Sequence, residues 1–101
     1  MNSVFKVFRE HEWKSFQEEK SFQGSAHDLK DGFIHLSNES QIEKVIQKYF
    51  SEISPIYVAK FSKPEFLQQL KWEASSTGEI YPHLYSAPLL VSDLDSFQLV
   101  E

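Results

Sequence analysis

The amino-acid sequence predicts a single α+β domain over residues 1–101, built from a bent, mostly antiparallel sheet and about three helices. Its length suffices for one hydrophobic core and is too short for two. The composition, 41% hydrophobic and 15% aromatic, is typical of a folded globular protein. Short runs of β-branched and aromatic residues mix with helical patterns in no regular βαβ order, which favours antiparallel pairing.

Several short segments are expected to form strands because β-branched and aromatic residues dominate them. They are residues 4–8, 33–36, 56–61, 71–74, 88–92 and 96–100. Residues 79–85 are expected to be extended or turn-rich, because Pro82 disfavours helix for itself and for its predecessor.

The strongest helical pattern covers residues 40–50, where apolar side chains recur at the spacing of one helix face. These side chains are Ile42, Val45, Ile46 and Tyr49. A second helix is expected over residues 11–22 and a short third one from Pro64. Residues 26–30 are predicted to form a loop, with His27 as an exposed loop residue.

Composition and charge exclude several classes of function. The formal net charge is −5 and Arg9 is the only arginine, so a nucleic-acid partner is not expected. The absence of cysteine excludes disulfides, thiolate catalysis and Cys-ligated zinc. No apolar run is long enough to cross a bilayer, so we expect a soluble cytoplasmic protein with no membrane partner.

The stretch from Asp31 to Ser37 is the centre of the predicted site. Asp31 and Gly32 form a strong turn signal, and a strand follows. In an extended conformation, Phe33, His35 and Ser37 share one face and are free to line a cleft. Asn38, with a Gln three residues later, predicts a capped helix start, where backbone amides favour an anionic ligand.

The remaining chemical candidates are sparse polar residues among apolar ones: His35, Ser37, Glu73, His83 and Tyr85. Glu73 follows Trp72 at a strand position, where a carboxylate is expected to have either a hydrogen-bonding partner or a chemical function. The structural alternatives are a Glu73 paired with a lysine or a backbone amide, and a hydrogen-bonded His83–Tyr85 pair. His35, His83 and Glu73 are also zinc or iron ligand types, but no motif spacing supports them, so no metal is predicted.

Three motifs in order carry a family resemblance: residues 32–37 followed by Gln41, then Trp72 with Glu73, then residues 82–85. Together they resemble the family known as domain of unknown function 952, over nearly the whole chain. One departure is Ser86, where the family usually has glycine. The resemblance implies a fold similar to the ADP-ribosyltransferase superfamily, with a segment that looks like that of tRNA 2′-phosphotransferases. Those enzymes bind phosphate through several basic residues, whereas this chain has a single arginine. The resemblance therefore implies an NAD or ADP-ribose pocket rather than phosphotransferase activity.

Two hypotheses follow. In the first, the chain is an ADP-ribosyltransferase-like enzyme that takes NAD as a substrate and acts at its nicotinamide N-glycosidic bond. Glu73 and His35 would be catalytic, and the ligand-binding residues would be Ser37, His83, Tyr85 and Trp72. The pyrophosphate would lie near the helix that starts at Ser40. In the second, the chain is a non-catalytic module that binds a nucleotide, another small ligand or a protein.

Overall fold

Three small antiparallel sheets and four α-helices make up the computed structural model, which describes residues 3–101. The strands are β1 (Val4–Arg9), β2 (Ser21–Phe22), β3 (Ile34–His35), β4 (Ile56–Phe61), β5 (Leu70–Ala74), β6 (Ile80–Leu84), β7 (Leu89–Leu90) and β8 (Ser96–Val100). The helices are α1 (Glu10–Glu19), α2 (Ala26–Asp31), α3 (Ile42–Tyr49) and α4 (Pro64–Leu67), with 3-10 turns η1 (Glu39–Gln41) and η2 (Val91–Asp93).

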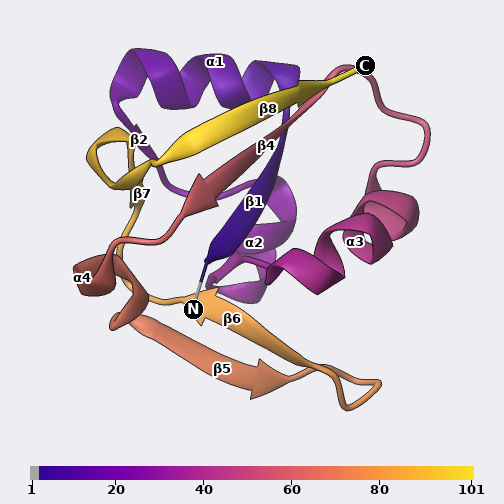
Figure 1. Cartoon of the computed structure of the whole chain (residues 1–101), viewed down its shortest axis with the longest axis vertical. Helices are drawn as coiled ribbons and strands as arrows, with labels where there is room; N and C mark the ends of the chain where they lie inside the picture. Colours follow the sequence, from indigo (N-terminus) through magenta and orange to yellow (C-terminus); the bar gives the residue numbers. More distant parts are fainter. Residues whose placement is uncertain (1–2) are drawn as a thin grey trace.

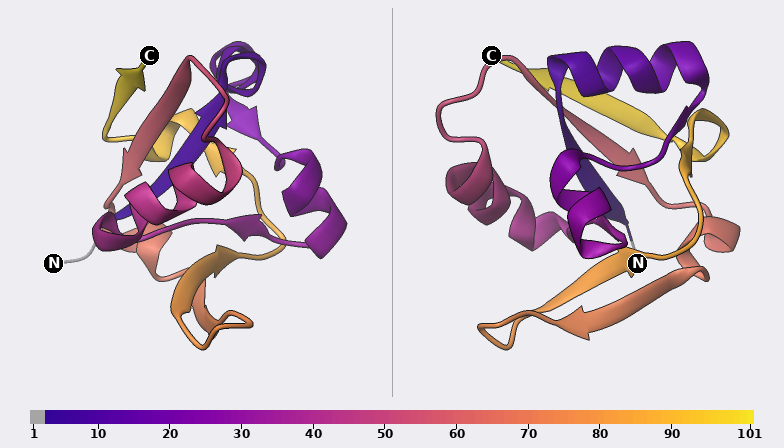
Figure 2. Two further views of the ribbon diagram at one scale, coloured as in Figure 1. Left: turned by 90° about the vertical axis from the view of Figure 1, so that its right-hand side faces the viewer. Right: turned by 180° about the vertical axis from the view of Figure 1, so that it is seen from behind.

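The sheets have strand orders β1-β4-β8, β2-β7 and β3-β6-β5. Helix α1 packs against the β1-β4-β8 sheet, and the β5–β6 hairpin lies at the opposite end of the molecule (Figures 1 and 2). An isolated antiparallel bridge between Phe5 and Ser37 connects β1 to the segment that follows β3. This bridge brings the first strand next to the sheet that carries the predicted site.

An aromatic cluster forms the main core, between α1 and the β1-β4-β8 sheet. The Phe8 ring lies 5.2 Å from the Phe16 ring and 4.9 Å from the Phe22 ring. Trp13 stacks on Tyr57 at 5.0 Å. Because ring pairs at these separations add to the burial of apolar area, they fix α1 on the sheet and leave the far edges of β1 and β3 free to form a site.

The α+β class with antiparallel pairing is confirmed, but the expectation of one bent sheet is wrong. Hydrogen bonding divides the strands into three sheets, because β3 has only two residues. The strands expected over residues 4–8, 56–61, 71–74 and 96–100 all form, and the stretch around Pro82 forms β6. Of residues 88–92, only Leu89–Leu90 pair as a strand before the chain turns into η2.

Two helix predictions need correction. The first helix ends at Glu19, since Lys20 adopts a left-handed conformation with φ 64°, and Phe22 belongs to β2. Residues 26–30 form α2 instead of a loop. The Ser25 side chain caps α2 by accepting a hydrogen bond from the Asp28 amide at 3.1 Å, which stabilises this short helix. Within residues 3–101, no helix is both long and apolar enough to span a bilayer.

Ser86 occupies a left-handed backbone conformation with φ 60°. Glycine adopts this conformation without a steric cost, whereas any residue with a Cβ atom is strained there. The conformation therefore explains why glycine suits this position. Ser86 keeps the same backbone course at a cost in stability.

We expect Ser86→Gly to increase the free energy of unfolding by about 1 kcal/mol, because it removes this strain. Equilibrium unfolding in urea, followed by far-ultraviolet circular dichroism, measures the change. The matched control is Ser92→Gly in η2, which should lower stability because glycine loses more backbone entropy there. A Ser86→Gly variant that is less stable than the wild type would show that the backbone at Ser86 is not strained.

Candidate functional site

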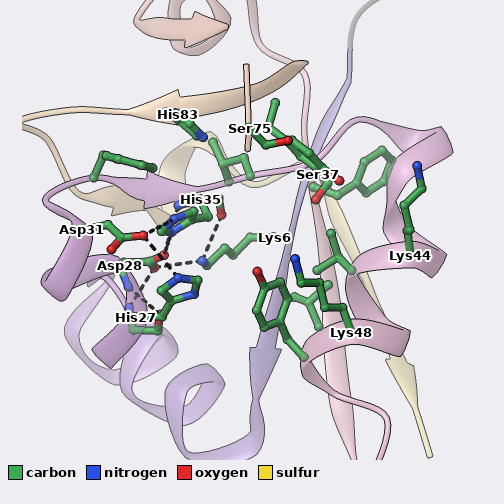
Figure 3. A pocket seen from close by; sticks show the side chains of 18 of the residues that line it. Lys6, His27, Asp28, Asp31, His35, Ser37, Lys44, Lys48, Ser75 and His83 are labelled. Atoms are coloured by element: carbon green, nitrogen blue, oxygen red, sulfur yellow. Dashed lines mark hydrogen bonds and ion pairs between the residues drawn. The ribbon is translucent and has the colours of Figure 1, made fainter. Parts of the chain in front are cut away.

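A cavity of about 650 Å³ opens between β1, β3, α2, α3 and the β5–β6 hairpin (Figure 3). This volume is in the range of pockets that hold small-molecule ligands. Its wall contains the histidines His27, His35 and His83 and the lysines Lys6, Lys44 and Lys48. The elements that meet here are far apart in the sequence, so the cavity depends on tertiary contacts.

A buried ionic network holds one side of the cavity together. Lys6 on β1 donates from Nζ to Asp28 Oδ2 at 2.8 Å and to the His35 carbonyl oxygen at 2.9 Å. Asp28 Oδ1 accepts from the His35 amide at 3.0 Å and lies 2.7 Å from His35 Nδ1. One carboxylate therefore joins β1, α2 and β3.

Local sequence explains why Asp28 can occupy this position. The Ser25 amide donates to Asp28 Oδ2 at 2.8 Å, which completes a reciprocal capping box at the start of α2. A Cβ atom added at Gly24 would lie 2.9 Å from the Asp28 Cβ atom, closer than two carbon atoms tolerate. Gly24 also has φ 129°, which other residues rarely adopt. The glycine before the cap therefore leaves room for the buried carboxylate.

Asp28 and Lys6 form a buried pair of opposite charge, and each shifts the pKa of the other. Burial on its own raises the pKa of the Asp28 carboxyl, but the hydrogen bond from His35 and the charge of Lys6 outweigh it and hold that pKa well below its usual range. Burial lowers the pKa of the Lys6 ammonium, and Asp28 opposes this effect. Asp28 is therefore an ionised acceptor at neutral pH.

His27 is exposed, as predicted, but it lies on a helix rather than in a loop and contributes to the site. It lies on α2, and its ring stacks on that of His35 at 4.3 Å. His27 Nε2 and His35 Nε2 lie 3.2 Å and 2.9 Å from the same atom, Asp31 Oδ2. Helical spacing between His27 and Asp31 would have revealed this pair, had the helix been predicted.

A second polar group lies across the β3–β6 pairing, where His35 and His83 are directly opposite each other. Glu73 Oε1 is 2.7 Å from His83 Nδ1 and accepts from the Tyr85 hydroxyl at 2.7 Å. These two hydrogen bonds lower the pKa of the Glu73 carboxyl, and the bond to Glu73 raises the pKa of the Tyr85 hydroxyl. His83 and Tyr85 thus each bond to Glu73 instead of to each other, and they take the place of the lysine or backbone amide considered as the structural partner of Glu73.

The structure brings only some of the predicted residues to the cavity. His35, Ser37 and His83 line it, whereas Glu73 and Tyr85 lie behind His83, outside the lining. Trp72 is outside the lining too, and 45% of its surface is exposed. His35, His83 and Glu73 do not converge on one point, because His83 Nδ1 is directed to Glu73 whereas His35 is held by Asp28 and Asp31.

The predicted capping at Asn38 is confirmed, and it limits anion binding at this helix start. Asn38 Oδ1 accepts from the Gln41 amide at 3.1 Å, and Gln41 Oε1 accepts from the Asn38 amide at 3.0 Å. These amides are therefore not free for a pyrophosphate. Positive charge comes instead from Lys44 and Lys48 on the cavity side of α3, and Lys44 is paired with Glu79 at 2.7 Å.

We expect Asp28→Asn to lower the free energy of unfolding at pH 7 by about 3 kcal/mol, because Lys6 loses its buried counter-charge. The pKa of Asp28 is lower in the folded state, so its contribution is complete above the usual carboxyl pKa. It is lost as the pH falls toward the folded-state pKa. The difference between variant and wild type should therefore narrow below about pH 4.

Urea titrations between neutral and acidic pH measure this narrowing. Asp93→Asn, on η2 outside the cavity lining, is the control and should change stability little. An Asp28→Asn variant as stable as the wild type at pH 7 would contradict the role assigned to the buried pair.

Comparison with known proteins identifies the family. A family model described as "Protein of unknown function (DUF952)" matches residues 7–96. The crystal structure of protein CC0527 from Caulobacter crescentus is similar, with a TM-score of 0.90 and 35% identity over 98% of this chain and 86% of that one. The solution NMR structure of CC0527 has a TM-score of 0.81 and 36% identity over 95% and 82% of the two chains. No curated protein matches the chain. The chain belongs to the DUF952 family, whose fold it shares with CC0527.

Proposed function

We propose that the cavity binds a nucleotide-type ligand, NAD or ADP-ribose, and that the chain acts as an ADP-ribosyltransferase-like enzyme at the nicotinamide N-glycosidic bond. The observation that carries the proposal is the Glu73–His83 pair at the wall of a cavity of about 650 Å³. A carboxylate and an imidazole in contact supply both an anion and a base beside a pocket of ligand size. The sequence resemblance to the ADP-ribosyltransferase superfamily points to the same chemistry.

The cavity offers complementary groups for such a ligand. Lys48 lines it and forms no ion pair with any carboxylate of residues 3–101, so its ammonium is available to a phosphate. Phe33 and Tyr49 line the cavity as well and present aromatic faces to a base or to nicotinamide. His35 and Ser37 also line the cavity and are the partners proposed for ribose hydroxyls.

The protonation of the Glu73–His83 pair supports a catalytic role. Because the Glu73 carboxyl is ionised at neutral pH, His83 Nδ1 carries the proton that joins them. His83 Nε2 is then a free base in the neutral imidazole. A base whose opposite nitrogen is held by a carboxylate is the arrangement that general-base catalysis uses.

In the proposed reaction, nicotinamide leaves with the electron pair of its bond to the ribose C1′ atom. The ribose acquires positive charge, and the Glu73 carboxylate, which lies outside the cavity lining, acts on it through its hydrogen bond to His83. A nucleophile such as water then bonds to C1′, and His83 Nε2 accepts the proton that the nucleophile loses. Glu73 is thus the group that orients His83 and that stabilises the imidazolium formed when His83 accepts the proton.

The first prediction is saturable binding in a two-dimensional NMR titration of ¹⁵N-labelled protein with NAD, then with ADP-ribose. Shifts should cluster on His35, Ser37, Lys48 and His83, because these residues line the cavity. Amides of α1, on the other side of the core, should not move. Unchanged spectra at millimolar ligand would contradict nucleotide binding.

The second prediction concerns turnover. Glu73→Gln should keep ligand affinity and lose roughly 100-fold or more in the rate of nicotinamide release, because glutamine accepts the same hydrogen bonds without the charge. Chromatographic detection of nicotinamide measures the rate. Glu19→Gln on the exposed face of α1 is the matched control and should react like the wild type. Equal turnover in Glu73→Gln would exclude the assigned role.

The alternative function is a non-catalytic binding module. It is favoured by the place of Glu73 outside the cavity lining and by the net charge of −5. Saturable NAD binding without nicotinamide release would assign this function to the cavity. A protein partner would instead use exposed apolar residues such as Phe97 and Leu99 on β8, which are 54% and 43% exposed. It would leave the NMR signals of the cavity unchanged.

A further inference from the structure

His27, Asp31 and His35 form a compact cluster on the α2 side of the cavity (Figure 3). Two of them lie four residues apart on α2, and His35 follows the turn at Gly32. One nitrogen of each histidine and one oxygen of Asp31 lie within 4.8 Å of one another. The sequence predicts no metal, and the ligand-type residues it offers, His35, His83 and Glu73, share only His35 with this cluster.

Hydrogen bonding fixes which nitrogen of His35 faces Asp31 as an electron-pair donor. Asp28 Oδ2 accepts from Lys6 Nζ and the Ser25 amide, and its Oδ1 accepts from the His35 amide. Asp28 is thus an acceptor toward every neighbour, so His35 Nδ1, at 2.7 Å, must carry a proton. In the neutral imidazole, His35 Nε2 then bears the lone pair.

This assignment leaves two acceptors facing each other. His35 Nε2 and Asp31 Oδ2 are 2.9 Å apart, and neither carries a proton when the imidazole is neutral and the carboxylate ionised. Such an approach needs a positive charge between the atoms, either a second proton on His35 or a metal ion. His27 Nε2 lies 3.2 Å from the same oxygen and can serve as a third ligand.

Two of the three separations suit a tetrahedral zinc shell. Ligand atoms about 2.0–2.1 Å from Zn²⁺ lie roughly 3.3 Å apart at tetrahedral angles, close to the 2.9 Å and 3.2 Å from the histidine nitrogens to Asp31 Oδ2, and all three ligand atoms lie within 4.8 Å of one another. Asp28, hydrogen-bonded to His35 Nδ1, is the outer carboxylate that commonly orients a zinc-bound histidine. Lys6 is held on the far oxygen of Asp28, so a carboxylate separates its charge from the cluster.

We propose that His27, Asp31 and His35 bind a divalent transition-metal ion, for which zinc is the best match, with the remaining coordination position open to the cavity. Two imidazoles and one carboxylate are borderline-soft ligands that suit zinc better than calcium or magnesium. All three residues line the cavity, so a water molecule or an anionic ligand can reach the open position. The proposal stands without the nucleotide hypothesis, because it concerns the metal ion alone.

Calorimetric titration of untagged, EDTA-treated protein with zinc chloride tests the site. We expect one zinc ion per chain with a dissociation constant in the micromolar range or below. His27→Ala and Asp31→Asn should each weaken binding about tenfold or more. Both side chains are partly exposed, at 47% and 36%, and neither contributes to the Lys6–Asp28 pair, so the variants should fold. His11→Ala, on the exposed face of α1, is the control and should bind zinc like the wild type.

Cobalt(II) provides an independent readout, because a tetrahedral site with nitrogen and oxygen ligands gives intense visible absorption. Zinc should displace cobalt and abolish these bands. Absence of stoichiometric zinc binding would overturn the proposal, as would variants His27→Ala and Asp31→Asn that bind zinc as tightly as the wild type does. The charge between His35 and Asp31 would then be a second proton on His35. Neither result would affect NAD binding measured with EDTA present, so failure of this proposal and failure of the proposed function are distinguishable.

Discussion

The buried carboxylate of Asp28 is the interaction on which the cavity wall depends. It accepts hydrogen bonds from β1 through Lys6, from the start of α2 through Ser25 and from β3 through His35. Core residues such as Phe8 and Ile34 anchor β1 and β3, whereas Asp28 is the only buried residue of α2, so the carboxylate is what ties this helix to the two strands. A charged pair in the interior costs desolvation energy, which the surrounding donors offset. Its structural effect is to hold three segments in one geometry.

Two histidines with similar hydrogen bonding lie on neighbouring strands of this wall. Antiparallel pairing of β3 and β6 places His35 opposite His83, with their rings 5.6 Å apart. Each histidine is held at Nδ1 by a different carboxylate, Asp28 or Glu73, at 2.7 Å. Each therefore presents Nε2 as its reactive atom, one toward Asp31 and one without a hydrogen bond in the described part of the chain. This shared arrangement is the basis of both proposals, in which His35 binds a cation and His83 accepts a proton.

The predictable part of the fold was the part with strong periodicity. The strand over Ile56–Phe61 is predictable because β-branched and aromatic residues dominate it. The helical pattern ending at Tyr49 is predictable because its apolar residues recur at the spacing of one helix face. Helix α2 was missed because its only large apolar residue, Leu29, is 65% exposed, so no hydrophobic pattern marks it. It is stabilised by caps at both ends, the Ser25 capping box and the left-handed Gly32.

The candidate site was predictable to the same extent. The strand face of His35 and Ser37 followed from alternation along the chain, and both residues line the cavity. The buried Lys6–Asp28 pair could not be predicted, since its partners are 22 residues apart and a lysine in a strand pattern normally faces solvent. His27 is not predicted as a site residue because the helix that carries it, α2, is not predicted either. Long-range ion pairs leave no local signal in a single sequence.

The protonation of the His35 imidazole, observed by long-range ¹H–¹⁵N NMR correlation near neutral pH, tests the role of Asp28 most directly. We expect a proton on Nδ1 that exchanges slowly with water, because it is shared with the buried Asp28 carboxylate. Asp28→Asn should abolish this protection. A neutral His35 with its proton on Nε2, or an Nδ1 proton that exchanges as freely in the wild type as in Asp28→Asn, would contradict the claim that Asp28 orders the cavity wall.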